Sequence, residues 1–130
     1  MAPQVFSSFS LTGDERFDPD DFTAATGLTP TTCWRKGDVS RGRARQHSFW
    51  CLTVGPDLTP EHEEQVLHLL DVMEPQAEVI ARLIEQNDVD AQFGLWSRDA
   101  GTDESTPDVQ LSSSVLNRVT ALGASLDIDM

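Results

Sequence analysis

The sequence predicts a protein of the α+β class, a two-layer sandwich in which helices pack on one sheet. Three observations lead to this prediction: segments in which apolar residues alternate with period two, segments in which they recur with helical spacing, and the order of these segments along the chain. The order is β-α-β-β-α-β followed by α-β. We interpret it as a ferredoxin-like core extended by one C-terminal α-β unit, in a single domain over residues 1–130.

The N-terminal third predicts a strand followed by a short helix. Residues 5–11 alternate between two faces, one of them strongly apolar. Asp18 is a suitable N-cap, Pro19 fits the first helical position, and Gly27 is suited to the left-handed residue that ends a helix. We therefore expect a well-delimited helix between Asp18 and Gly27.

Two further segments, residues 31–36 and 48–54, are rich in Thr, Trp, Phe and Val and predict the strands of a hairpin. The register of this hairpin is open at the sequence level. A turn centred on Gly42 places Trp34 opposite Trp50, whereas a turn with two central residues shifts every pair by one position.

The C-terminal half predicts helices that alternate with strands. A helix opens at Thr59 and Pro60, breaks near Pro75 and continues to Asn87. Residues 89–95 alternate as a strand. The polar segment from Arg98 to Asp108 is expected to be a loop. A last helix begins at Ser112 or Ser113 and ends at Gly123, and residues 126–129 form a closing edge strand.

Basic residues are concentrated in one part of an acidic chain. The formal net charge is −13, with a pI of about 4.3. Residues 35–45 hold five of the nine basic residues and carry about +4, so the rest of the chain carries about −17. This field argues against general binding to nucleic acid or to anionic membranes. The local positive cluster can still attract a small anion, because distant acids are screened.

This basic segment and its two flanking tryptophans form the candidate ligand-binding site. Guanidinium groups match phosphate and carboxylate geometry, and a tryptophan pair can hold a planar or cationic ligand. The same residues also have a purely structural interpretation, as a cross-strand aromatic pair and a basic hairpin that lies against acidic neighbours. The candidate residues are Trp34, Arg35, Lys36, Asp38, Arg41, Arg43, Arg45 and Trp50.

The sequence assigns no catalytic residue, metal ligand or cofactor. Helical metal ligands are spaced by three or four residues, but His62 and His68 are six apart. The residues around Lys36 lack the P-loop pattern. Asp127 and Asp129 lie on the same side of a strand and can hold a hard cation weakly, although solubility and protection of the sheet edge explain them as well.

The two cysteines, Cys33 and Cys51, are too few for a disulfide framework and lack zinc-site spacing. We expect free thiols, although the sequence does not decide whether they oxidise. Cys51 has two interpretations, a nucleophile paired with His47 or an inert buried thiol, and the inert thiol is favoured because free cysteine is among the most buried residue types. Because neither a signal peptide nor a long apolar run is present, we expect a cytoplasmic protein.

The run Pro30-Thr31-Thr32-Cys33-Trp34-Arg35-Lys36-Gly37-Asp38 is the densest cluster of unusual residues. Together with Gly13-Asp14, Asp18-Pro19, Gly27-Leu28, Trp50 and Leu126-Asp127-Ile128-Asp129, it resembles the uncharacterised bacterial family called domain of unknown function 4279. The resemblance spans Phe9 to Ile128. It implies a small intracellular bacterial protein of α+β type and transfers no catalytic residue. The family usually ends on an aromatic residue, where this chain has Met130.

Three hypotheses for the function follow. The leading one is a non-enzymatic binding or regulatory module, for example an inhibitor or an immunity-type protein, that recognises a basic protein partner, because an acidic surface accelerates such encounters. The second is a small-molecule protein or enzyme that holds an anionic or planar ligand at the basic hairpin near Trp34 and Trp50. The third is a structural module that forms a homodimer.

Overall fold

A computed structural model of the protein describes residues 4–98 and 111–129. The strands are β1 (Gln4–Gly13), β2 (Thr32–Trp34), β3 (Val39–Ser40), β4 (Arg43–Ala44), β5 (Ser48–Val54), β6 (Asp90–Arg98) and β7 (Ala124–Asp129). The helices are α1 (Pro19–Thr26), α2 (His62–Met73), the 3₁₀ turn η1 (Glu74–Gln76), α3 (Ala77–Asn87) and α4 (Ser113–Ala121). The loop expected from Arg98 to Asp108 lies, after Arg98, outside the described residues.

Five strands form the main sheet in the order β2-β5-β1-β6-β7, and β3 and β4 form a separate small ribbon. The neighbouring strands are antiparallel except for β6 and β7, which are parallel. The α+β class is therefore confirmed. The sheet differs from a simple four-stranded antiparallel core, because the chain returns after α4 and adds β7 as a fifth strand at one edge.

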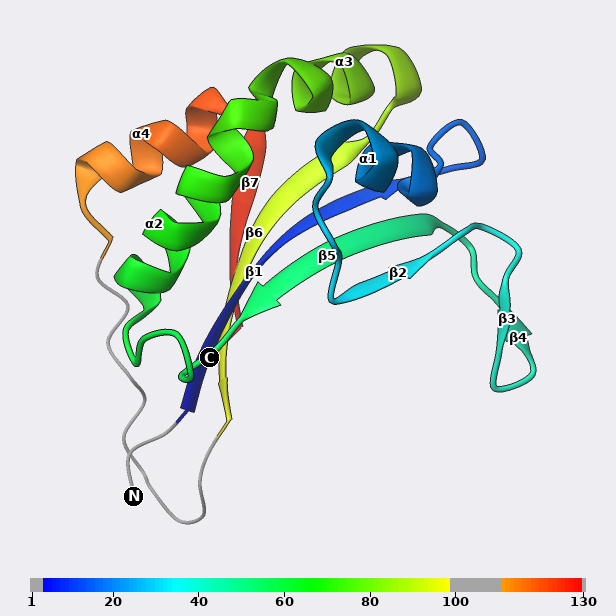
Figure 1. Ribbon diagram of the computed structural model, residues 1–130. Coiled ribbons are helices and arrows are strands. Elements are labelled where there is room, and N and C mark those ends of the chain that lie inside the picture. Colours follow the sequence, from blue (N-terminus) through cyan, green and yellow to red (C-terminus); the bar gives the residue numbers. More distant parts are fainter. Residues whose placement is uncertain (1–3, 99–110, 130) are drawn as a thin grey trace.

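The four α-helices of the described residues lie on one face of the sheet (Figure 1) and contribute to one hydrophobic core. The strand register directs Phe9, Trp50 and Phe93 toward the helices, and none of these side chains is exposed. No helix of the described residues lies over the other face, which we call the open face. None of the described helices has the length and apolarity that crossing a membrane requires.

The ends of the helices follow from short-range chemistry. The Asp18 carboxylate accepts a hydrogen bond from the backbone of Asp20 at 2.9 Å, and Gly27 ends α1 with φ 73°. Pro75 lies in η1, which confirms the expected break. Helix α2 begins at His62, later than the sequence predicts, because the backbone carbonyl of Thr59 is held by the side chain of Gln65 at 2.9 Å.

The hairpin between β2 and β5 adopts the shifted one of the two registers left open by the sequence. Arg41 and Gly42 are the two central residues of its turn and both have positive φ, 53° and 76°, as a type I′ turn requires. The same register continues into the main sheet, where Trp34 pairs with Phe49. The pairing of Trp34 with Trp50 is therefore wrong.

Candidate functional site

The two tryptophans of the candidate site lie on opposite faces of the sheet. Trp34 pairs with Phe49 across the strands, and Trp50 follows Phe49 in β5, so Trp50 points to the other face. Trp50 is fully buried under α1, where its indole N–H donates to the Thr23 hydroxyl at 3.0 Å and its ring meets Phe22 edge-on. The two indoles cannot clamp one ligand, and Trp50 belongs to the core.

Trp34 lies on the open face, in an aromatic and cationic cluster. Its ring stacks on Phe49 with centroids 4.6 Å apart, and the guanidinium carbon of Arg45 lies 3.8 Å from the ring centroid. Such cation–π contacts are favourable by about 0.5–1 kcal/mol at exposed sites. The indole therefore already has a planar cation as its neighbour.

Arg35 and Lys36 are neutralised by acids at the start of α1. Arg35 forms salt bridges with Asp18 at 3.1 Å and with Asp20 at 2.5 Å, and Lys36 contacts Glu15 at 2.8 Å. The hydrogen bond to Asp18 raises the pKa of Arg35, and the hydrogen bond to Glu15 raises the pKa of Lys36. These contacts match the structural interpretation of the two residues, since they tie the hairpin to its own acidic body.

Asp38 shapes the turn that separates β2 from β3. Its carboxylate accepts a hydrogen bond from the backbone N–H of Arg35 at 2.9 Å. Its backbone carbonyl accepts from the N–H of Arg45 at 2.7 Å. Gly37, with φ 95°, completes the turn. Asp38 thus has a structural role that its position in the sequence did not reveal.

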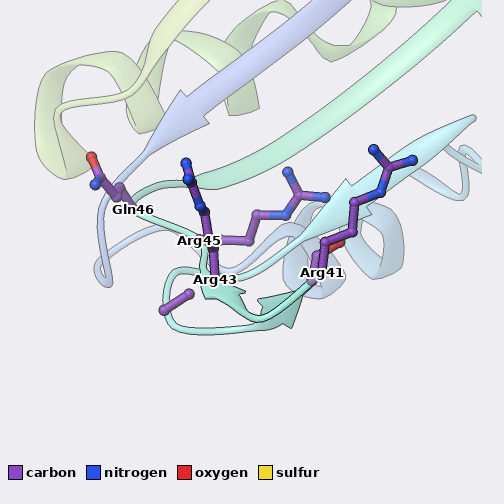
Figure 2. Close-up of a pocket in the computed structure, with 6 residues that line it drawn as sticks. Arg41, Arg43, Arg45 and Gln46 are labelled. Carbon is purple, nitrogen blue, oxygen red and sulfur yellow. The ribbon is translucent and has the colours of Figure 1, made fainter.

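The other three arginines of the candidate site share one side of the β3-β4 ribbon. Figure 2 shows the side chains of Arg41, Arg43 and Arg45 extending from the ribbon toward the same side. They line an open concavity of about 600 Å³, together with Ser40, Ala44 and Gln46. Within the described residues the side chains of Arg41 and Arg43 form no hydrogen bond and no ion pair. The concavity can hold an anion with several negative oxygens, which guanidinium groups bind as forks.

The sequence did not reveal that one face of the sheet is open. In β1 the residues Phe6, Ser8 and Ser10 point to this face, and in β6 Gly94 and Trp96 do so. Their alternation was visible in the sequence. The sequence does not tell on which face of the sheet each helix packs. One face stays uncovered only when every helix packs on the opposite face.

The cysteines and acids outside the basic segment form no metal centre. Cys33 is exposed and Cys51 is buried, and both are free thiols. Cys33 pairs with Trp50, and Cys51 with Thr32, so the two thiols point to opposite faces. Among residues 4–98 and 111–129 no group of three or more His, Cys, Asp or Glu side chains is arranged to hold a metal ion.

These features define a small α+β protein with a basic ribbon, an acidic body and one open sheet face. Residues 3–130 match the family described as Domain of unknown function (DUF4279), and the chain belongs to that family. The family resemblance seen in the run from Pro30 to Asp38 is confirmed. Neither the curated proteins nor the solved structures include a match to this chain.

Proposed function

We propose that the protein is a non-enzymatic binding module that recognises a basic protein partner. The supporting observation is the distribution of charge. Arg16, Arg35, Lys36 and Arg118 are held in salt bridges with acids of the same chain. These four bases are already paired, whereas other acids of the described residues, among them Glu78, Glu85, Asp127 and Asp129, are exposed and have no salt bridge, in a chain with a net charge of −13. Such a surface attracts a positively charged protein and speeds association.

An inhibitor or an immunity protein is a module of this kind, because it must find one basic enzyme quickly. We expect the immobilised protein to retain proteins of high pI from cell extract at about 50 mM salt, and one of them to form a stoichiometric complex after purification. Its association rate should fall at least tenfold between about 50 and 500 mM salt. If no basic protein forms such a complex, or if the rate is independent of salt, the proposal is wrong.

A second candidate function is the binding of a small anion at the β3-β4 ribbon. Its support is the concavity beside Arg41, Arg43 and Arg45. Nucleotides, sugar phosphates and carboxylates should then raise the melting temperature, and the double variant Arg41→Ala with Arg43→Ala should lose this effect. The variant Arg82→Ala removes an exposed arginine of α3 and is the matched control. An equal response of both variants would eliminate this candidate.

Three further expectations concern a ferredoxin-like core, a cytoplasmic location and homodimerisation. The antiparallel order β2-β5-β1-β6 supports a ferredoxin-like core to which β7 was added. Cytoplasmic location and homodimerisation stay predictions. Sedimentation at high protein concentration tests homodimerisation, and a monomer at every concentration would contradict it.

A further inference from the structure

The open face of the sheet contains a hollow that includes Asp127 and Asp129 but none of the candidate ligand-binding residues of the basic segment. Its volume is about 290 Å³. Strands β5, β1, β6 and β7 supply the lining, in which Ser8, Ser10, Gly94, Trp96, Asp127 and Asp129 are the residues that matter below. The hollow lies in the described part of the chain and on the face opposite the helices.

Gly94 forms the floor of the hollow. In the register of the sheet it lies between Ser8 of β1 and Asp127 of β7. A Cβ atom at this position would come within 3.1 Å of the Ser8 hydroxyl oxygen. Because Gly94 has no side chain, the surface of the sheet is recessed at this position. Glycine inside a strand often marks such a site, where another group can approach the backbone closely.

Trp96 forms one wall. It stacks on Phe6 with ring centroids 5.7 Å apart and an interplanar angle of 12°. Among the described residues its indole N–H has no hydrogen-bond acceptor, and its ring holds no cation, in contrast to the ring of Trp34 under Arg45. A half-buried indole of this kind offers both an aromatic surface and a donor to a partner.

The rim carries two carboxylates. Asp127 lies beside Gly94, and Asp129 lies beside Trp96. Both are exposed, and neither has a salt bridge within the described residues. Since they are two residues apart on one strand, they are about 7 Å from each other and on the same side. One guanidinium can lie between them and over the indole.

We propose that this hollow receives an arginine side chain of the basic partner. The inference rests on the proposed function and names the site and the contacts. Arginine fits better than lysine, because its planar group stacks on aromatic rings and forks onto carboxylates, whereas an ammonium group does neither. The aliphatic stem would lie over the glycine floor, and the guanidinium would lie between Asp127, Asp129 and Trp96. Within the protein itself, the guanidinium of Arg45 lies over the indole ring of Trp34.

Tryptophan NMR tests the proposal, because the three indoles are in three places: Trp96 lies at the hollow, Trp34 lies on edge strand β2 under Arg45, and Trp50 lies in the core. The probe is the peptide acetyl-Gly-Ser-Arg-Ser-Gly-amide, and the same peptide with neutral citrulline in place of arginine is its control. Indole signals are assigned with the Trp96→Phe and Trp34→Phe variants. We expect the arginine peptide to shift the Trp96 signal with millimolar affinity and leave Trp50 unchanged, and the citrulline peptide to have no effect.

Two variants alter the hollow in different ways. The double variant Asp127→Asn with Asp129→Asn removes the rim charges, and Gly94→Ala fills the floor without changing charge. Each should weaken binding of the peptide, and of the purified basic partner, at least fivefold, while circular dichroism shows that the variant is folded at the temperature of the assay. The matched control is Glu78→Gln with Glu85→Gln, which removes two exposed charges from α3 and should bind as the wild type does.

The outcomes separate this inference from the proposed function. If a basic partner binds with the expected salt dependence but both hollow variants bind it as tightly as the wild type, the hollow is not the site and the proposed function stands. If the peptide shifts the indole signal of Trp34 and not that of Trp96, the hollow is likewise not the site, and the proposed function stands. If neither the peptide nor any basic protein binds, both proposals fall.

Discussion

At the scale of single residues, one polar side chain joins the sheet to a helix by hydrogen bonds. Gln65 of α2 is completely buried. Its amide oxygen accepts from the Ser7 hydroxyl at 2.7 Å, and its amide nitrogen donates to the carbonyls of Val5 and Thr59, each at 2.9 Å. The residue thus joins β1, α2 and the turn before α2. The apolar stripe of α2 was readable from the sequence, but a buried glutamine within it was not.

Replacing Gln65 by alanine should therefore be costly. The change leaves a buried hydroxyl and two carbonyls without partners and also removes side-chain volume, so we expect the free energy of unfolding to fall by about 2–4 kcal/mol. Urea denaturation measures it. The control Gln86→Ala, at an exposed position of α3, should cost less than about 0.5 kcal/mol. Similar losses for both variants would show that the buried hydrogen bonds contribute little.

The two thiols should differ sharply in reactivity. Burial raises the pKa of Cys51, while Cys33 is exposed. A raised pKa lowers the fraction of thiolate at any given pH, and thiolate is the reactive form. A thiol-specific chromogenic reagent at pH 8 should therefore modify one cysteine quickly and the second only after unfolding. Cys33→Ser should abolish the fast phase. If Cys51→Ser abolished it, the expected placement of the two thiols would be wrong.

At the scale of elements, Arg16 joins the loop after β1 to the end of α3. Its guanidinium bridges Asp14 at 2.9 Å and Asp88 at 3.1 Å. The hydrogen bonds from Arg16 lower the pKa of Asp14 to about 2. Because the folded state favours the ionised carboxyl, the contribution of Asp14 to stability is present above pH 4 and is lost as the pH falls toward 2.

Carboxyl NMR should show this depression directly. We expect Asp14 to titrate with a midpoint near pH 2 in the wild type and to rise part of the way toward its ordinary value of 3.8 in Arg16→Ala. The guanidinium donor is gone in this variant, whereas the backbone N–H of residue 16 still donates to the Asp14 carboxylate. The control variant Arg82→Ala should leave the midpoint of Asp14 in place. A midpoint that does not move in Arg16→Ala would mean that the bridge does not persist in solution.

The sequence predicted most elements because their signals are local. The cap at Asp18, the stop at Gly27 and the break at Pro75 each depend on one or two neighbouring residues. The division of the hairpin into β2 with β5 and β3 with β4 was missed, since it depends on hydrogen bonds between Asp38 and Arg45 that form only after the strands have met.

At the scale of the whole molecule, only part of the site could be predicted. The sequence located the positive cluster, but pairing of Arg35 with Asp18 and Asp20 depends on how α1 packs against the hairpin. The hollow combines Gly94 with Asp127, residues that meet only through the parallel pairing of β6 and β7. Contacts between distant segments carry no local signal, so these parts had to come from the structure.

The excess of negative charge should make stability depend on salt. Like charges on a folded surface repel one another, and salt screens this repulsion. We expect the melting temperature to rise by a few degrees between about 50 and 500 mM NaCl, as measured by circular dichroism. The double variant Glu78→Gln with Glu85→Gln carries two fewer charges and should show a smaller rise. A melting temperature that falls as NaCl is added would mean that the salt bridges stabilise the fold more than the repulsion between like charges destabilises it.

The two-residue turn at Arg41 and Gly42 has a consequence for what the protein presents to its surroundings. If one residue were added there and the pairing of β2 with β5 shifted by one position, every side chain of β2 would point to the opposite face of the sheet. The indole of Trp34 would then exchange places with the thiol of Cys33. The length of this turn thus decides whether a binding molecule that approaches the sheet surface without helices meets an aromatic ring or a sulfhydryl group.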